Sequence, residues 1–438
     1  MDKIIKRQIW GKLLEDLERK DITVLLGPRQ TGKTTLILKL IEHLKEFGVN
    51  PDNIFYYNFD DVDLRSRVKK DFRFIQKDIE QKLGKPIGEE KEKLYLFIDE
   101  GQKSPAVFEL VKIFYDKGLN IKICISGSSS INIKDKSAET LSGRVSYFYL
   151  SPLTFAEAAG VDFSVYQIVE RIKDKKDIAE LSSVSYKRSE YYKSILDKML
   201  FFGGMPKIYE AGSKDSVVYL NNFLSSYLDK DIKDIGAKVN IESFHLSFKY
   251  LSSYCAGLFN FSKLGEDLGI KRDSLYRYFE LMEKTLVVKT VSPFVFPEVK
   301  NIFKSRKLFF FDNGIVNRLK GFLSFEEMER AGFTGKIAEN FVFQNFFAKS
   351  LNDVKKPDFY YFRDYQNHEI DFIYQRGDIT VPIEVHYSSS FNNKTLNNFS
   401  NFFSHERSSK YGIIFYLGEV KEIEVNKHKV FALPFFLI

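Results

Sequence analysis

Two patterns of apolar and polar residues, continuous apolar runs and apolar residues at helical spacing, predict the strands and helices of the chain. The run ITVLL (22–26) is continuously apolar, which indicates a buried strand. The next segment, TTLILKLIEHL (34–44), repeats apolar residues every three or four positions, as a helix facing a core does. Further apolar runs lie at 53–61, 92–102 and 120–130. Strands that alternate with helices in this way predict a parallel α/β sheet.

The middle of the chain has a helical pattern. Residues 162–200 are rich in charges, which most simply form a solvated helix face. The helical pattern continues to about residue 236. We expect this region to form a helical lid next to the sheet domain.

A helix-turn-helix pattern follows. FSKLGEDL (261–268) predicts a short helix and SLYRYFELMEK (274–284) a second one, while Asp273 in the turn between them can cap the second helix. The buried face of the second helix is expected to carry Leu275, Phe279 and Met282. The run LVVKTVSPF (286–294) suits a pair of wing strands.

The C-terminal part begins with an amphipathic pattern at 334–350, which predicts a helix. Three short β-patterned runs come next, at 359–364, 369–377 and 380–387. The order is therefore one helix followed by strands, in a region separate from the first sheet.

Composition limits the classes of protein that fit. A chain of 438 residues predicts about three domains, and 44% hydrophobic with 29% charged residues is globular. The net charge of +7 permits an acidic partner without requiring one. Cys124 and Cys255 lie in apolar runs, which predicts buried free thiols in a reducing compartment. No apolar run approaches the roughly 18 residues of a membrane span, so we expect a cytoplasmic protein without membrane contact.

The loop between the first strand and helix has the pattern G-x-x-x-x-G-K-T, from Gly27 to Thr34. Glycines let such a loop wrap a phosphate chain with its N–H groups pointing inward, and the helix N-terminus adds positive charge. Lys33 is expected to reach the β- and γ-phosphates of ATP, and Thr34 to hold Mg²⁺. A chance glycine loop is the alternative, which the strand-loop-helix context disfavours. The expected nucleotide-binding residues are Gly27, Pro28, Arg29, Gln30, Thr31, Gly32, Lys33, Thr34 and Thr35.

Two other strand ends complete the expected catalytic site. The strand in EKLYLFIDEGQ ends in Asp99 and Glu100, which we expect to bind Mg²⁺ and to polarise the attacking water, respectively. Ser126, at the polar end of another strand, is a candidate sensor of the γ-phosphate. Because ligands of parallel sheets bind beyond the strands' carboxyl ends, these residues are expected to converge.

The combined motifs resemble those of a group of prokaryotic AAA-type ATPases with an uncharacterised C-terminal domain. The resemblance covers nearly the whole chain and rests on GPRQTGKTT, LFIDEGQ, SGSSS, ETLSGRVSYFYLSPLTFAEA and FFGGMPKIY. It implies a P-loop NTPase parallel sheet (1–150), a helical lid (151–238), a winged helix (239–300) and a restriction-endonuclease-like α/β domain (301–438).

The resemblance also gives meaning to two single residues. Arg144 could place a guanidinium near the γ-phosphate, from its own or a neighbouring subunit, or could simply be a surface arginine paired with an acid. Pro206, in Gly-Met-Pro, resembles the element that covers the adenine in related signalling ATPases, or could simply mark a turn.

The C-terminal acids follow the order of PD-(D/E)xK nucleases. By this resemblance, Glu339, Asp371 and Glu384 occupy the acidic positions, where carboxylates hold a metal against a phosphodiester. The position that is normally lysine is His386, which is mostly uncharged at neutral pH and could instead bind a metal. We expect weak or no nuclease activity.

Four basic residues of the helix-turn-helix are candidates for contact with DNA phosphates or bases. A winged helix that serves for packing or for protein contact is the alternative. The candidates are Lys271, Arg272, Arg277 and Lys284.

The overall expectation is a Mg²⁺-dependent ATPase acting on DNA or a protein partner through its later domains. Two alternatives stay open, a nucleotide-dependent switch with slow turnover and an ATP-gated nuclease. The sequence sets no oligomeric state.

Overall fold

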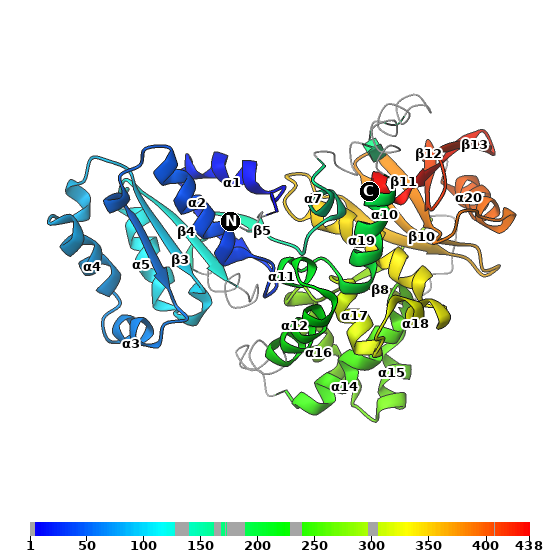
Figure 1. Cartoon of the computed structure of the whole chain (residues 1–438), viewed down its shortest axis with the longest axis horizontal. Coiled ribbons are helices and arrows are strands. Elements are labelled where there is room, and N and C mark those ends of the chain that lie inside the picture. Colours follow the sequence, from blue (N-terminus) through cyan, green and yellow to red (C-terminus); the bar gives the residue numbers. More distant parts are fainter. Residues whose placement is uncertain are drawn as a thin grey trace.

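The protein was analysed as a computed structural model that describes residues 5–127, 140–161, 168–170, 172, 189–227, 239–296, 305–406 and 408–438. Most of the predicted helical segment at 162–200, the expected helix end near residue 236 and the Ser128–Ser130 end of one predicted strand lie outside these residues. The described chain forms two lobes, with the N-terminal sheet in one and all later elements in the other (Figure 1).

The first lobe is built on five parallel strands in the order β2-β3-β4-β1-β5. Their carboxyl ends therefore meet at one edge of the sheet. The strand at 22–26 has the predicted bounds, and the other predicted strands of this sheet lie inside their predicted runs. The strands are β1 (Ile22–Leu26), β2 (Ile54–Asn58), β3 (Leu94–Asp99), β4 (Ile121–Gly127) and β5 (Val145–Tyr149).

Helices cover both faces of this sheet, which explains why the three central strands β1, β3 and β4 are buried at every residue without alternation. Alternate residues of β1 point to opposite cores: Val24 packs with α3, α4 and α5, and Leu25 packs with α1 and α2. The helices are α1 (Trp10–Leu17), α2 (Lys33–Glu46), α3 (Val62–Lys70), α4 (Phe74–Leu83) and α5 (Ala106–Asp116), with 3₁₀ turns η1 (Pro51–Asn53), η2 (Ile87–Glu89) and η3 (Gly101–Lys103). Cys124 is buried here and is free, as Cys255 is in the second lobe.

The second lobe begins with short helices after β5. Thr154 starts the first of them with a reciprocal cap, in which its hydroxyl accepts from Glu157 N and the Glu157 carboxylate accepts from Thr154 N. The helix α10 then packs against α17. The helices of this part are α7 (Phe155–Ala159), α10 (Ser189–Phe202), α11 (Pro206–Glu210), α12 (Ser213–Ser226), α17 (Asn313–Lys320) and α18 (Phe325–Arg330).

The helix-turn-helix segment differs from its prediction at two points. Its second helix begins at Arg272 with Lys271 as the N-cap, so the prediction that Asp273 caps it is wrong; Asp273 lies in the first turn. Residues 286–294 hold one strand rather than two, and that strand pairs with a strand beyond residue 304. The elements are α14 (Ile241–Leu251), η5 (Ser252–Tyr254), β6 (Gly257–Phe259), α15 (Phe261–Leu268), α16 (Arg272–Lys284), β7 (Val288–Pro293) and β8 (Arg306–Phe310).

A nine-stranded sheet runs through the second lobe in the order β13-β14-β12-β11-β10-β9-β7-β8-β6. The parallel contact of β7 with β9 joins the helix-turn-helix strands to the C-terminal strands, so the sheet crosses the boundary predicted at residue 300. One hydrophobic core spans Leu153 to Ile438. The further elements are α19 (Thr334–Ser350), β9 (Asp358–Arg363), β10 (Glu369–Arg376), β11 (Ile379–Val385), α20 (Asn393–His405), β12 (Tyr411–Tyr416), β13 (Lys421–Val425), β14 (His428–Pro434) and η6 (Phe435–Leu437).

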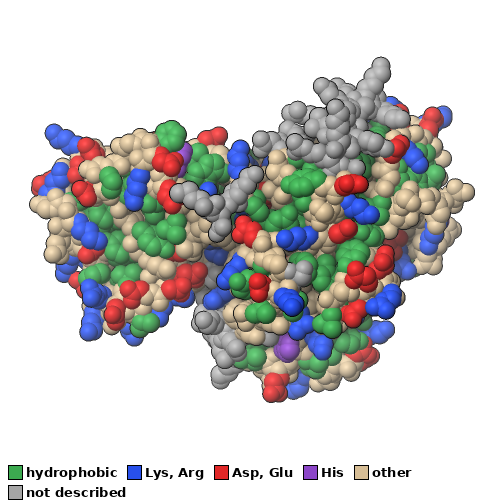
Figure 2. Space-filling model, viewed as in Figure 1, with side chains coloured by type: hydrophobic (Ala, Val, Ile, Leu, Met, Phe, Trp, Pro, Cys, Tyr) green, Lys and Arg blue, Asp and Glu red, His purple; other side chains and the backbone are tan. Residues whose placement is uncertain are grey.

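The helix α19 has the predicted bounds but not the predicted amphipathic character. Its buried residues include the consecutive run from Ile337 to Phe343, which covers every side of the helix. It therefore lies inside the lobe, between the sheet and the helices (Figure 1). On the surface, Figure 2 shows positive and negative side chains interspersed over the visible face of both lobes.

Candidate active site

The loop after β1 has a shape that depends on its two glycines. A Cβ atom on Gly27 would collide with the carbonyl oxygen of Leu150, and Gly32 has a left-handed φ of 92° directly before α2. The loop can therefore run close to β5 and still turn its backbone into the helix. The predicted phosphate-binding geometry follows from these two positions.

Lys33 is the first residue of α2, and its ammonium is folded against its own loop. The Nζ atom donates to Gly27 O at 2.9 Å and to Pro28 O at 2.8 Å. Two neutral carbonyl groups are weaker partners for a cation than phosphate oxygens are. The ammonium is thus positioned to exchange these carbonyls for the phosphates of a bound nucleotide.

Asp99 gathers donors from three neighbouring elements at the edge where the strands end. Its carboxylate accepts from Thr34 Oγ1 at 2.6 Å, from Tyr56 OH at 3.2 Å and from Ser126 Oγ. Burial and the charge of Asp99 raise the pKa of Tyr56. The Thr34 hydroxyl and the Asp99 carboxylate are adjacent hard oxygen ligands, so they fit the Mg²⁺ ion that the loop implies.

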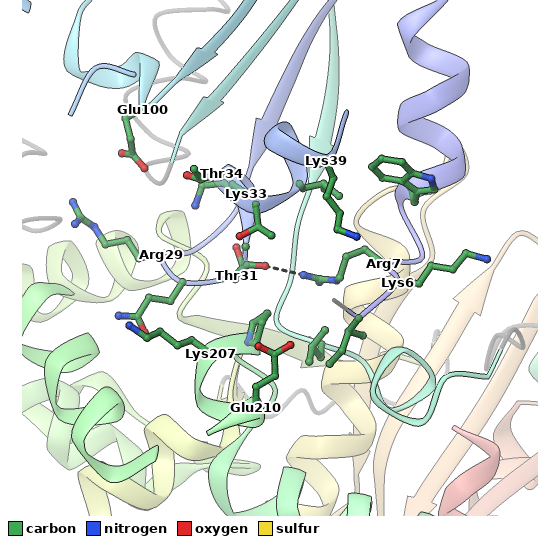
Figure 3. Close-up of a pocket in the computed structure, with 18 of the residues that line it drawn as sticks. Lys6, Arg7, Arg29, Thr31, Lys33, Thr34, Lys39, Glu100, Lys207 and Glu210 are labelled. Atoms are coloured by element: carbon green, nitrogen blue, oxygen red, sulfur yellow. Dashed lines mark hydrogen bonds between the residues drawn. The ribbon is translucent and has the colours of Figure 1, made fainter. Parts of the chain in front are cut away.

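Glu100 stands next to Asp99 in a left-handed conformation, with φ of 54°. This turn directs its side chain away from the sheet and into the cavity (Figure 3). Its Oε2 atom accepts from Gln102 Nε2 at 2.6 Å. A non-glycine residue in this region of φ/ψ space is uncommon and is often found at functional sites.

These residues open into a cavity of about 770 Å³. One wall comes from the phosphate-binding loop and α1, and the other comes from the second lobe through Leu153, Pro206, Lys207, Glu210 and Ser226. Figure 3 shows cationic side chains from both walls around the loop. Sequence reasoning missed Arg7, Trp10, Lys39 and Lys207 as lining residues, because they lie outside the glycine motif.

Arg7 ties the loop to the second lobe. Its guanidinium donates to Thr31 O at 2.7 Å (Figure 3), to Ser151 O at 2.5 Å and to Glu157 Oε1 at 3.1 Å. Both charged side chains are buried, so the pair is shielded from water. A shift of the loop would therefore be transmitted to the segment that starts the second lobe.

Pro206 lines the cavity as the first residue of α11. The turn before it is held by Asp312, whose Oδ2 accepts from Gly204 N at 2.7 Å, while Gly204 O accepts from Leu153 N at 2.6 Å. Burial raises the pKa of Asp312 to about 6. The wall that carries Pro206 is thus fixed by a carboxylate from the start of α17.

Two predicted catalytic residues are not among those that line the cavity. Arg144 pairs with Asp116 at 2.7 Å and directly precedes β5, so it lies at the amino end of that strand, and its contact with a γ-phosphate in the same chain stays a prediction. Ser126 is fully buried and donates to Asp99 rather than lining the cavity, and its role as a sensor of the γ-phosphate stays a prediction. A contact of Arg144 with a neighbouring subunit stays a prediction.

The predicted C-terminal acids do converge. Glu339 on α19 and Asp371 on β10 both lie against the ammonium of Lys307, at 2.6 and 3.3 Å. Glu384, near the end of β11, adjoins them and lies 3.7 Å from His386 Nε2. Burial and the charge of Asp371 raise the pKa of Glu384, while burial lowers the pKa of His386. Among the residues that the structure describes, no group of three or more His, Cys, Asp or Glu is arranged to hold a metal.

The basic residues of α16 lie on its exposed side. Lys271, Arg272 and Arg277 face solvent, and Arg272 donates to Tyr276 OH at 3.0 Å. Lys284 is different, because it pairs with Glu280 at 2.7 Å. The exposed positive charge is therefore concentrated at the N-terminal half of the helix.

Comparison with known proteins agrees with this site. Residues 19–159 match the family described as AAA domain, while residues 193–326 and 334–436 match two domains of unknown function (DUF8612 and DUF4143). With the parallel sheet and the glycine loop, this match shows that the first lobe is similar to P-loop domains of the AAA type.

Whole-chain relatives are distant. An uncharacterised protein of Mycobacterium tuberculosis (strain ATCC 25618 / H37Rv) is 23% identical over 389 residues, covering 88% of this chain and 75% of that protein. One of Haemophilus influenzae is 24% identical over 399 residues, covering 88% of both.

Solved structures similar to the chain include the replication initiator DnaA bound to AMPPCP and single-stranded DNA. It is 14% identical with a TM-score of 0.27, covering 65% of this chain and 91% of that one. A signal transduction ATPase with numerous domains from Pyrococcus horikoshii is 13% identical with a TM-score of 0.22, covering 80% of this chain and 47% of that one. Within the described residues, every helix is too short or too polar to cross a bilayer.

Proposed function

We propose that the protein is a Mg²⁺-dependent ATPase whose second lobe responds to the nucleotide and acts on DNA or on a protein partner. The observation that carries this proposal is the cavity itself, since one wall holds the phosphate-binding loop and the other belongs to the second lobe. A nucleotide in such a cavity contacts both lobes, so binding and release change how they are held together.

The chain's own residues supply the steps of hydrolysis. Lys33 neutralises phosphate charge, and Glu100 accepts a proton from the attacking water. Thr34 and Asp99 would hold Mg²⁺, which when bound neutralises charge on the β- and γ-phosphates. Arg7 and the turn before Pro206 hold the two walls of the cavity in fixed positions.

The DNA part of the proposal rests on a winged helix in the second lobe. The order α14-β6-α15-α16, followed by two antiparallel strands, supports this proposal, in which α16 would be the helix that enters a major groove. Its exposed Lys271, Arg272 and Arg277 would contact phosphates or base edges. A protein partner on the same face is the competing proposal.

A nucleotide switch is the second candidate, and the Arg7 contacts favour it. These hydrogen bonds join the loop directly to the second lobe. A bound nucleotide could therefore change the position of the second lobe without DNA or a protein partner. A switch needs slow hydrolysis and retained nucleotide, whereas a motor needs steady turnover.

ATP turnover with and without DNA, together with mass measurement in ATP and ADP, tests these proposals. Turnover that DNA stimulates supports the DNA-acting ATPase. Slow turnover with retained nucleotide and a change of mass supports the switch. A protein that binds no nucleotide would overturn both.

A further inference from the structure

The acidic cluster of the second lobe is built around a lysine. Lys307 lies on β8, and its side chain is 0% exposed. Its Nζ atom has four oxygen neighbours: Glu339 Oε1 at 2.6 Å, Asp371 O at 3.0 Å, Glu369 Oε1 at 3.1 Å and Asp371 Oδ1 at 3.3 Å. Three carboxylates and a carbonyl around one charge form an oxygen set of the kind that hard cations take.

The fold brings the lysine on β8 and these oxygen atoms together from three elements. Glu339 projects from α19, and Glu369 and Asp371 project from β10. The pairing of β10 with β9 shifts register between Ile370 and Ile373, so the segment that holds Asp371 and Phe372 departs from regular pairing, as in a bulge. A bulge releases a residue from regular pairing, and here both the carbonyl and the carboxylate of Asp371 turn to the same ammonium.

The other oxygen atoms of the acids also have partners inside the chain. Asp371 Oδ2 accepts from Val385 N at 2.9 Å, Glu339 Oε2 lies 3.2 Å from Lys336 Nζ, and Glu384 Oε1 accepts from Asn398 Nδ2 at 3.0 Å. His386 Nε2 is 3.0 Å from Thr395 Oγ1. The ligand atoms that a metal would need are engaged already.

We propose that the ammonium of Lys307 stands where the nuclease-like arrangement would place a divalent cation, and that the cluster therefore binds no metal. This proposal rests on the prediction that residues 301–438 form a nuclease-like domain. The residues present do not fit a metal, because a second cation among them would be repelled by Lys307 at close range. The cluster serves instead to join β8, which belongs to the helix-turn-helix strands, to α19 and β10.

The competing assignment makes Lys307 the lysine that position 386 lacks, working beside a metal. Its burial argues against this, since an ammonium closed in by three carboxylates cannot reach a phosphodiester. The two assignments predict opposite results for metal binding by the wild-type chain.

The test is a titration of the full, nucleotide-free chain with Mn²⁺, in which the electron paramagnetic resonance signal of free Mn²⁺ measures how much is bound. Wild type and Asp371→Asn should bind the same amount, because the cluster holds none. Lys307→Gln should gain one equivalent per chain, and Lys307→Gln/Asp371→Asn should lose it. The matched control is Lys289→Gln on the neighbouring strand, where the lysine lies over the Phe347 ring, and it should gain none.

Two outcomes overturn the inference: a wild-type chain whose Mn²⁺ binding falls on Asp371→Asn, or a folded Lys307→Gln that gains no Mn²⁺. If Lys307→Gln does not fold alone, circular dichroism with added Mn²⁺ decides, since recovery of the native spectrum supports the inference and no recovery refutes it. ATP turnover of wild type is measured in parallel, so failure of the proposed ATPase is seen separately.

Discussion

Lys33 is held against the carbonyls of its own loop, and this makes it the clearest single-residue test of nucleotide binding. Replacement of Lys33 by alanine removes the main counter-charge at the phosphates. We expect ATP affinity to fall by about 10- to 100-fold, the value of one or two charged hydrogen bonds. Titration with a fluorescent ATP analogue measures it, with Lys45→Ala at the other end of α2 as control. Equal loss in both variants would contradict the assignment.

Glu100 tests the chemical step. Glu100→Gln keeps the size of the side chain and its contact with Gln102, but it cannot accept a proton. ATP affinity should therefore stay within about two-fold, while turnover falls by on the order of 10²–10⁴. Phosphate release under saturating ATP measures this. Undiminished hydrolysis would mean that the base is another residue.

At the scale of single residues, the sequence predicted what a local motif defines. The loop from Gly27 to Thr34 lies next to Asp99 and Glu100, as expected for residues at the carboxyl ends of neighbouring parallel strands. Arg7 and Lys307 could not be predicted, because their partners lie far along the chain and no short pattern marks them. Ser126 and Arg144 are not among the residues that line the cavity, because a residue's place beside a motif does not fix where its side chain points.

The turn before α11 gives a pH-dependent prediction at the scale of an element. With a pKa of about 6, Asp312 is charged at pH 7.5 and accepts from the backbone of the turn, but it is mostly protonated at pH 5.5. The protonated form is a weaker acceptor by about 1 kcal/mol, so the Pro206 wall loosens. We expect nucleotide affinity to fall about five-fold as the pH drops through 6.

The control for this prediction is Asp312→Asn, which carries no titrating group at this position. Its affinity should be low at both pH values, measured by the same fluorescence titration. The protonation of ATP itself is common to both proteins and cancels in the comparison. Parallel pH profiles in the two proteins would rule out Asp312 as the cause.

The helix α16 tests the DNA proposal. Lys271→Glu/Arg272→Glu reverses two exposed charges at its start, so DNA affinity should fall and the salt dependence should become shallower by about two counterions. Fluorescence anisotropy over a range of salt concentrations measures both. Lys284→Glu is the matched control on the same helix and should have the smaller effect, because Lys284 is already paired with Glu280. An unchanged salt slope would favour protein contact.

At the scale of elements, the apolar pattern predicted four of the five strands of the first sheet and the helix at 334–350, but not β5. The continuous nine-stranded sheet was not predicted, since the pairing of Ser292 with Tyr360 joins segments about 70 residues apart. The buried position of α19 was also not predicted. Its polar residues Asn340 and Asn345 suggest a solvated face, but both are buried and bonded inside the lobe.

At the scale of the molecule, the lobes meet in a second place besides the nucleotide cavity. Asn352, just beyond α19, donates through Nδ2 to Tyr149 O at 2.7 Å and accepts at Oδ1 from Tyr149 N at 2.7 Å. Lys12 on α1 donates to Asn352 O at 2.6 Å. The end of the helix that carries Glu339 is thus bonded to the sheet of the first lobe.

This contact also has a consequence for self-association. The strand β5 is an edge of its sheet, and an edge with free backbone groups can recruit a strand from another molecule. The amide of Asn352 takes both backbone groups of Tyr149 and so imitates one residue of a sixth strand. Asn352→Ala should leave this edge open, so that light scattering detects more aggregate at high concentration than in wild type or in an Asn426→Ala control. A single side chain would then prevent the edge strand of one molecule from pairing with a strand of another.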